Sequence, residues 1–250
     1  MKHHPKFYGC LLTFLLFAFI PSSQAQESLS IRTAHLEEDQ PLHSFKVEYP
    51  ELTHWKNPKR QQQFNKKIGT LIGGRLISFR RIAKNWAQES KRLSPTNRKT
   101  SFWVSYQVLN DHAPVLSILF NGSTFLAGAT RPRENFITVN FNLKTGKEIS
   151  LKDIFKKKVF YLQLLSEIAQ TQLMKGMNSG ADPNLITLGT GPTPRNFQNF
   201  NITPKGLLIQ FEPNQVAPYQ AGPQQVLVPY DMVWNALRPK FIKLISKPNL

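Results

Sequence analysis

The side chains that could carry out chemistry are few and scattered. Beyond the first 25 residues the histidines are His35, His43, His54 and His112, and no two of them lie one helical turn apart, as a helical metal pair requires. The adjacent Asp111-His112 stands in turn-forming sequence, where such residues are common. No serine has the Gly-x-Ser-x-Gly setting of a nucleophile elbow. We therefore expect no catalytic residues, no metal site and no cofactor.

Carboxylates leave one enzymatic alternative open. Glycoside hydrolysis needs only two carboxylates that meet in space. The candidates are Glu48, Glu51, Glu134 and Glu212. The sequence does not indicate which two of them lie close together in space.

The N-terminus has the pattern of an export signal. Lys2 and Lys6 precede an apolar run over Phe7–Ile20, and small residues follow at Ser23–Ala25. This run is shorter than the roughly 20 apolar residues that a spanning helix needs. We expect residues 1–25 to be a cleaved signal peptide and no transmembrane segment to remain. The single cysteine, Cys10, lies within it, so the mature protein in the periplasm or outside the cell has no thiol.

Positive charge is concentrated in one segment of a basic chain. The formal net charge is +17, or +15 without Lys2 and Lys6. The segment Lys56–Lys99 holds thirteen Lys or Arg residues and one acid, Glu89. A charge so localised attracts anions. Export makes nucleic acid an unlikely partner.

This segment also predicts a helix to about Gln88. Asn57-Pro58 is a typical start, and apolar residues follow at spacings of three and four. These are Phe64, Ile68, Leu71, Ile72, Leu76, Phe79, Ile82, Ala83 and Trp86. The basic residues on the other faces are Lys66, Lys67, Arg75, Arg80, Arg81 and Lys84. They form either a solvated surface or a binding surface for an anionic polymer.

Alternation and turn residues place the other elements. A second helix is expected over Asp153–Met177, with Phe160 facing inward, followed by a loop over 178–199. Strands are expected over 43–49, ended by Pro50, and over 101–109, 115–120, 136–143, 207–211 and 226–228. The fold class is therefore α+β, an antiparallel sheet with two longer helices packed on it. We expect a flexible segment at 26–42, a single domain at 43–237 and a basic tail at 238–250.

The stretch Phe211–Tyr230 resembles a signature of the domain-of-unknown-function 3298 family. The matching residues are Phe211, Ala217-Pro218-Tyr219, Gly222 and Pro229-Tyr230, and Asn142–Lys147 resembles the family upstream. The family often has Gly-Gly-Ala-His where this chain has Ala127-Gly128-Ala129-Thr130, so that histidine is absent. The resemblance implies an α+β domain that works outside the membrane by binding. Such domains form the outer part of RsiV-type anti-sigma factors, which bind lysozyme, and related domains accompany PdaC-type deacetylases.

These observations lead to one hypothesis and two alternatives. The hypothesis is an exported, non-catalytic cell-envelope protein that contacts an anionic polymer or lipid surface through its basic helix, with Tyr219 as a further contact. One alternative is a peptidoglycan-modifying enzyme or its accessory domain. The other is a module that recognises or inhibits a wall hydrolase such as lysozyme, although a chain of +15 repels the basic lysozymes of animals.

Overall fold

The computed structural model describes residues 29–93, 99–112, 114–176 and 182–246. The expected signal peptide lies outside them. The helices are α1 (Pro58–Leu93), α2 (Leu151–Ile154), α3 (Tyr161–Lys175), α4 (Pro183–Gly189), α5 (Tyr230–Val233) and α6 (Pro239–Ile245), with short turns η1 (Tyr219–Ala221) and η2 (Trp234–Ala236). No described helix is long and apolar enough to cross a membrane.

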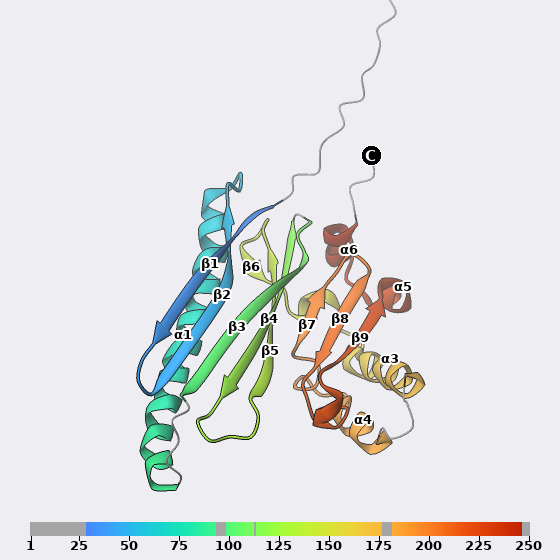
Figure 1. The fold of residues 1–250 in the computed structure, drawn as a ribbon. Coiled ribbons are helices and arrows are strands. Elements are labelled where there is room, and N and C mark those ends of the chain that lie inside the picture. The colour runs from blue at the N-terminus through green and yellow to red at the C-terminus, as the bar shows by residue number, and fades with distance from the viewer. Residues whose placement is uncertain (1–28, 94–98, 113, 177–181, 247–250) are drawn as a thin grey trace, which may run out of the picture.

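A six-stranded sheet forms the N-terminal part of the fold. Its strands are β1 (Ser30–Asp39), β2 (His43–Thr53), β3 (Thr100–Asn110), β4 (Val115–Phe125), β5 (Arg133–Asn142) and β6 (Lys147–Glu148). They lie side by side in chain order. All pairs are antiparallel except β2 and β3, which are parallel and are connected through α1. The α+β fold class is confirmed (Figure 1).

Helix α1 covers one face of this sheet. Its start follows the expected capping, since the Asn57 side-chain oxygen accepts from the Arg60 backbone N–H at 3.1 Å. Six residues of its inner stripe are buried: Phe64, Ile68, Ile72, Leu76, Phe79 and Ala83. Ile82 was expected there but is 44% exposed, because it projects about 100° away from its neighbour Ala83.

A second core belongs to residues 151–246, here called the C-terminal lobe. Its antiparallel sheet has the order β7 (Phe200–Ile202), β8 (Gly206–Phe211) and β9 (Gln224–Pro229). Helices α3 to α6 surround this sheet (Figure 1). The most buried members of the core include Leu165, Phe197, Ile209, Phe211 and Leu237.

A buried polar network joins the lobe to the six-stranded sheet. Asn140 of β5 donates from its amide to the Phe200 carbonyl at 2.8 Å. Its side-chain oxygen accepts from the Ile202 N–H at 2.8 Å and from the Ser117 hydroxyl at 2.7 Å. Asn201 in turn donates to the Ser117 oxygen at 2.9 Å. We call Ser117, Asn140 and Asn201 the junction network; none is more than 2% exposed.

The expected second helix is broken in two. Helix α2 ends at Ile154 and α3 begins only at Tyr161. Between them Phe155 forms a bridge to Leu237 and stacks on Tyr161 at a centroid distance of 5.1 Å, which holds the chain out of helical geometry. Phe160 was predicted to face inward, and it is 88% exposed. The expected loop at 178–199 also contains helix α4 within its described part.

The described residues of both end segments form regular structure. The segment expected to be flexible forms β1, which pairs with β2 over residues 30–39. Strand β2 continues through Pro50 to Thr53, whereas its pairing with β3 ends at Val47. Pro50 therefore pairs only with β1, and its missing N–H interrupts no hydrogen bonding to β3. The expected basic tail begins with α6, whose Phe241 is 2% exposed and packs in the core of the lobe.

Candidate binding surfaces

The basic residues of α1 separate into paired and unpaired groups. The Lys67 ammonium lies 2.7 Å from a Glu148 carboxylate oxygen, and the Arg80 guanidinium lies 2.5 Å from Glu38. Lys66, Arg75, Arg81 and Lys84 are exposed and have no acidic partner in the described parts of the chain. Only these four of the six predicted residues are therefore available to an external anion.

Arg80 has a structural role. Its guanidinium binds Glu38 of β1 and lies 5.2 Å from the ring centre of Phe45. His43 contacts the same carboxylate at 2.8 Å. The hydrogen bonds from Arg80 and His43 hold the pKa of Glu38 below its usual value, and the bond to Glu38 raises the pKa of Arg80. These contacts tie α1 to the first two strands.

Helical geometry aligns the unpaired cations. Lys66 and Lys84 are 18 residues apart, which is five turns, so they project in one direction about 27 Å apart along the axis. Lys59 and Arg81 fall within about 60° of that direction, whereas Arg75 projects about half a turn away. Lys59 is also exposed, without an acidic partner in the described chain. We call Lys59, Lys66, Arg81 and Lys84 the basic face.

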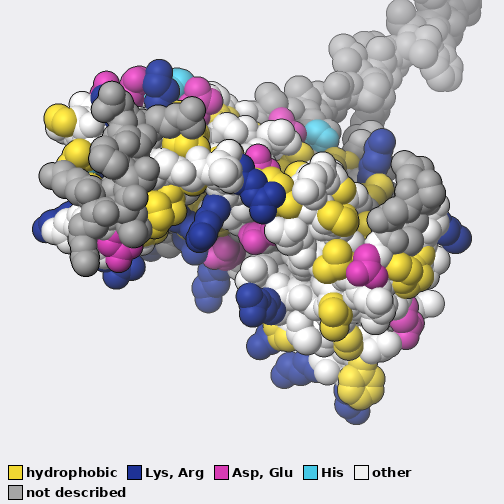
Figure 2. All heavy atoms as spheres, turned by 60° about the horizontal axis from the view of Figure 1, so that its bottom comes forward, with side chains coloured by type: hydrophobic (Ala, Val, Ile, Leu, Met, Phe, Trp, Pro, Cys, Tyr) yellow, Lys and Arg dark blue, Asp and Glu magenta, His cyan; other side chains and the backbone are white. Residues whose placement is uncertain are grey.

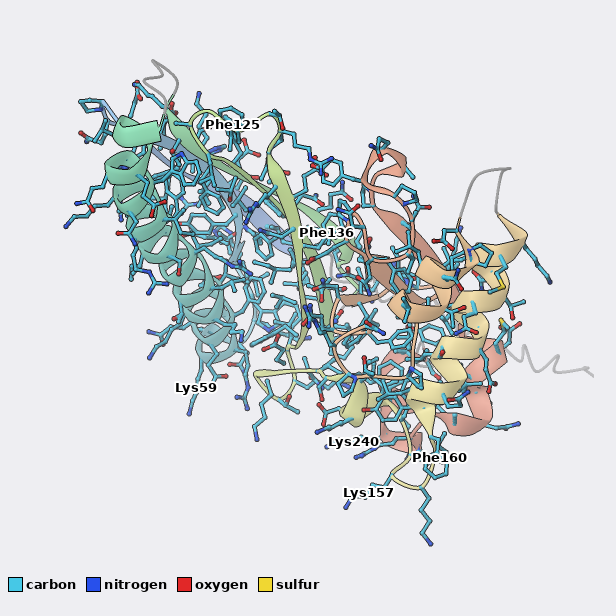
Figure 3. All side chains as sticks on the ribbon, turned by 90° about the horizontal axis from the view of Figure 1, so that it is seen from below. Lys59, Phe125, Phe136, Lys157, Phe160 and Lys240 are labelled. Carbon is cyan, nitrogen blue, oxygen red and sulfur yellow. The ribbon has the colours of Figure 1, made fainter. Side chains whose placement is uncertain are left out.

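A second basic region lies on the C-terminal lobe, and the sequence prediction missed it. Lys156-Lys157-Lys158 and Lys240 are exposed beside Phe160. Figure 3 shows Lys157, Phe160 and Lys240 along one edge, with Lys59 on the same side of the molecule. In Figure 2, Lys and Arg side chains extend across the middle of the face shown and around the lobe. The triple-lysine run was the sequence signal for this region.

Tyr219 acts as a clamp. Its hydroxyl donates to the Pro132 carbonyl at 2.8 Å, and the Arg131 guanidinium carbon lies 3.8 Å from the centre of its ring. The connection between β8 and β9 thereby contacts the segment between β4 and β5. Gly222 has φ 69°, a conformation that favours glycine. One face of the Tyr219 ring is thus already covered by an internal contact.

The face of the six-stranded sheet opposite α1 is hollowed. A groove of about 540 Å³ lies over β2 to β5 and is bounded by Pro223 of the clamped connection. Its side chains alternate with the buried residues of the same strands. We call it the sheet groove. Its principal side chains are Glu48, Trp103, Ser105, Asn121, Ser123, Glu134 and Phe136.

Two of the four candidate carboxylates line this groove, from strands β2 and β5 with β3 and β4 between them. Glu48 and Glu134 both line it. Glu51 is paired with Arg32, and Glu212 accepts from the Asn199 amide at 3.3 Å. The Asp111-His112 pair is half-exposed, with 3.3 Å between the ring nitrogen and the carboxylate. Within the described ranges no group of three or more His, Cys, Asp or Glu could hold a metal ion.

Comparison with known proteins confirms the resemblance seen in the sequence. Residues 152–231 match the family model "Protein of unknown function (DUF3298)", and residues 36–130 match the model "Deacetylase PdaC". The two matches together cover parts of both sheets of the fold. A solved DUF3298 family structure from Bacteroides fragilis superposes with a TM-score of 0.68 at 14% identity. The superposition covers 88% of this chain and 98% of the Bacteroides fragilis chain, which shows a shared fold.

Two curated relatives are considerably longer. The chain is 25% identical over 222 residues to the peptidoglycan-N-acetylmuramic acid deacetylase PdaC of Bacillus subtilis, covering 88% of this chain and 44% of the relative. It is 31% identical over 113 residues to the immunogenic protein MPT64 of Mycobacterium tuberculosis, covering 44% and 47%. This chain thus spans less than half the length of both relatives.

Proposed function

We propose that this protein is an exported, non-catalytic cell-envelope module that binds an anionic polymer or lipid surface through the basic face. The observation that carries the proposal is the row of exposed cations on α1 that have no acidic partner among the described residues. The likeness to PdaC, a peptidoglycan deacetylase by its name, supports a place in the envelope. The N-terminal apolar run of the sequence supports export.

The geometry of the basic face suits an extended ligand. Lys59 and Lys84 are 25 residues apart, so the row runs for about 37 Å along one rigid helix. Between its two basic ends it presents Gly73 and Ile77, which is 70% exposed. Lys66 and Arg81 are 15 residues apart, which is about 22 Å along the axis. This exceeds the screening length of about 8 Å at physiological salt, so the two ends of the row contact separate anionic groups. A polymer or headgroup layer with repeated phosphates or carboxylates supplies such groups, whereas a small anion does not.

Co-sedimentation with isolated envelope components tests the proposal. The mature protein is incubated with purified peptidoglycan sacculi and with vesicles containing lipopolysaccharide, at 50 mM and 500 mM salt. We expect retention at low salt that falls at high salt, because exposed charges are screened. Because sacculi and vesicles are tested separately, the result shows whether the protein binds the polymer or the lipid surface.

Paired variants separate a local surface from general charge. The test variant changes Lys59, Lys66, Arg81 and Lys84 to glutamine. The control changes four exposed residues of the C-terminal lobe to glutamine, Lys152, Lys175, Arg195 and Lys205, and so has the same net charge. We expect the test variant to lose most of its retention and the control to keep it. Equal losses, or retention that ignores salt, would refute the basic face as the binding surface.

A second candidate function is an accessory role in peptidoglycan modification. The match to PdaC favours it, because the aligned region accounts for 44% of that enzyme and leaves the rest of its length to other segments. Release of acetate from purified peptidoglycan by this chain alone would instead support the enzymatic version. No release, together with envelope binding, would favour the accessory role.

A further inference from the structure

The sheet groove is built from two adjacent rungs of the six-stranded sheet. In the first rung, strand pairing aligns Lys46 of β2, Trp103 of β3, Ser123 of β4 and Glu134 of β5. In the second, it aligns Ser105, Asn121 and Phe136, and Glu48 stands two residues beyond Lys46. Neighbouring residues of one rung lie about 5 Å apart on the same face of a sheet. The two rungs therefore form a compact platform of aromatic rings, amides, hydroxyls and carboxylates.

This platform is the part of the sheet face that the C-terminal lobe leaves open. Further along the same strands, β7 covers the sheet through the junction network and through a bond from the Phe200 N–H to the Thr138 hydroxyl. Over the platform, Trp103 stays 44% exposed although it lies on a central strand. Figure 3 shows Phe136 on the sheet between α1 and the lobe. Pro223 forms one wall, and the Tyr219 clamp anchors the connection that carries it.

The charge of the groove is opposite to that of the basic face. Glu48 and Glu134 both line it, and Glu134 has no basic partner in the described chain. Glu48 has only a 3.7 Å contact to the exposed His35. The one lysine, Lys46, lies 3.1 Å from a Glu37 carboxylate and is thereby largely compensated. An anionic polymer would be repelled here, so the groove requires a different kind of ligand.

We infer that the sheet groove binds a neutral saccharide chain. Sugar rings have apolar C–H faces that can stack on the rings of Trp103 and Phe136, and hydroxyls that can donate to Glu48 and Glu134. Asn121 and Ser123 both donate and accept, which suits hydroxyl and acetamido groups. The volume of about 540 Å³ lies within the range of small-ligand sites. This site is separate from the basic face and does not depend on it.

Binding of a defined sugar tests the inference. The probe is the β-1,4-linked tetramer of N-acetylglucosamine, titrated into the mature protein and followed by calorimetry and tryptophan fluorescence. We expect saturable binding that is insensitive to salt. Trp103→Ala should weaken it by about tenfold or more, as removal of an aromatic anchor does. Glu134→Gln should weaken it less, since the amide still accepts a hydrogen bond.

A matched variant controls for loss of an exposed tryptophan. Trp234 is 44% exposed like Trp103, but it lies in η2 of the C-terminal lobe and outside the groove. Trp234→Ala should bind the tetramer as the unchanged protein does, and both variants should keep the circular dichroism of the fold.

Three outcomes overturn the inference. They are no binding of the tetramer by the unchanged protein, equal weakening by the two tryptophan variants, and preferential binding of a tetralysine peptide at Trp103. The last result would assign the groove to a cationic peptide through its carboxylates. None of them bears on the basic face, which the glutamine variants test separately.

Discussion

Replacing Asn140 by leucine should uncouple the C-terminal lobe from the six-stranded sheet. Leucine has a similar size but can neither donate to the Phe200 carbonyl nor accept from the Ile202 N–H and the Ser117 hydroxyl. Each buried polar group left unpaired costs about 1–3 kcal/mol. Burial of the leucine side chain offsets about 1–2 kcal/mol of the total. We therefore expect a loss of about 3 kcal/mol, a large fraction of the stability of a typical domain.

Urea denaturation and hydrogen exchange together measure this effect. The midpoint should fall, and amides of β7, β8 and α3 should exchange faster than those of α1 and β2, because the lobe opens from the sheet. Gln107→Leu, an exposed amide on β3, serves as the control and should change stability by less than about 0.5 kcal/mol. Two results would refute the coupling role of the junction network. One is a loss of unfolding free energy below about 1 kcal/mol for Asn140→Leu, and the other is equal acceleration of exchange in the C-terminal lobe and in α1 and β2.

Three further variants test individual contacts. Tyr219→Phe removes the bond to the Pro132 carbonyl while keeping the ring, so thermal unfolding should show a loss of about 1 kcal/mol; no loss would mean that the hydroxyl is solvated. Phe160→Ser should change the unfolding free energy by less than about 0.5 kcal/mol, because the ring is 88% exposed. A loss of several kcal/mol would mean that Phe160 is buried after all. The lowered pKa of Glu38 means that folding stabilises its ionised form. The carboxylate therefore adds to the free energy of unfolding at neutral pH, and this contribution is lost as the pH falls through the lowered pKa. Glu38→Gln should therefore lower the urea midpoint at pH 7, and the difference should shrink as the pH falls through the lowered pKa of Glu38. A difference that stays constant with pH would assign the effect to packing.

Elements with a clear apolar pattern could be predicted from the sequence. Strand β5 alternates, and its Val139 and Phe141 are buried as expected. Strand β1 escaped prediction because most of its residues are exposed, so no apolar alternation marks it. Its order comes from pairing with β2 and from cross-strand ion pairs such as Lys46–Glu37, which a local pattern cannot show. The break before α3 likewise depends on the distant Leu237.

The candidate sites were predictable to different extents. The basic residues of α1 and their exposure followed from composition and helical spacing. The pairing of Lys67 and Arg80 did not, because Glu148 and Glu38 come from remote strands. The sheet groove required the register of four strands, which brings residues 46 to 136 onto one platform. The one local sign was Trp103, a large aromatic on the otherwise polar side of its strand.

The alternation of strand residues also decides how the two proposed sites relate. Residues that face α1 form the core beneath the basic face, and their neighbours face the opposite side of the sheet and form the groove. Helix α1 and the sheet beneath it therefore separate the proposed anion surface from the proposed saccharide groove, and neither ligand obstructs the other. Two weak contacts on one rigid body raise the effective affinity for a material that contains both chemistries. A wall in which neutral glycan and anionic polymer lie side by side meets that requirement, and either component alone meets only half of it.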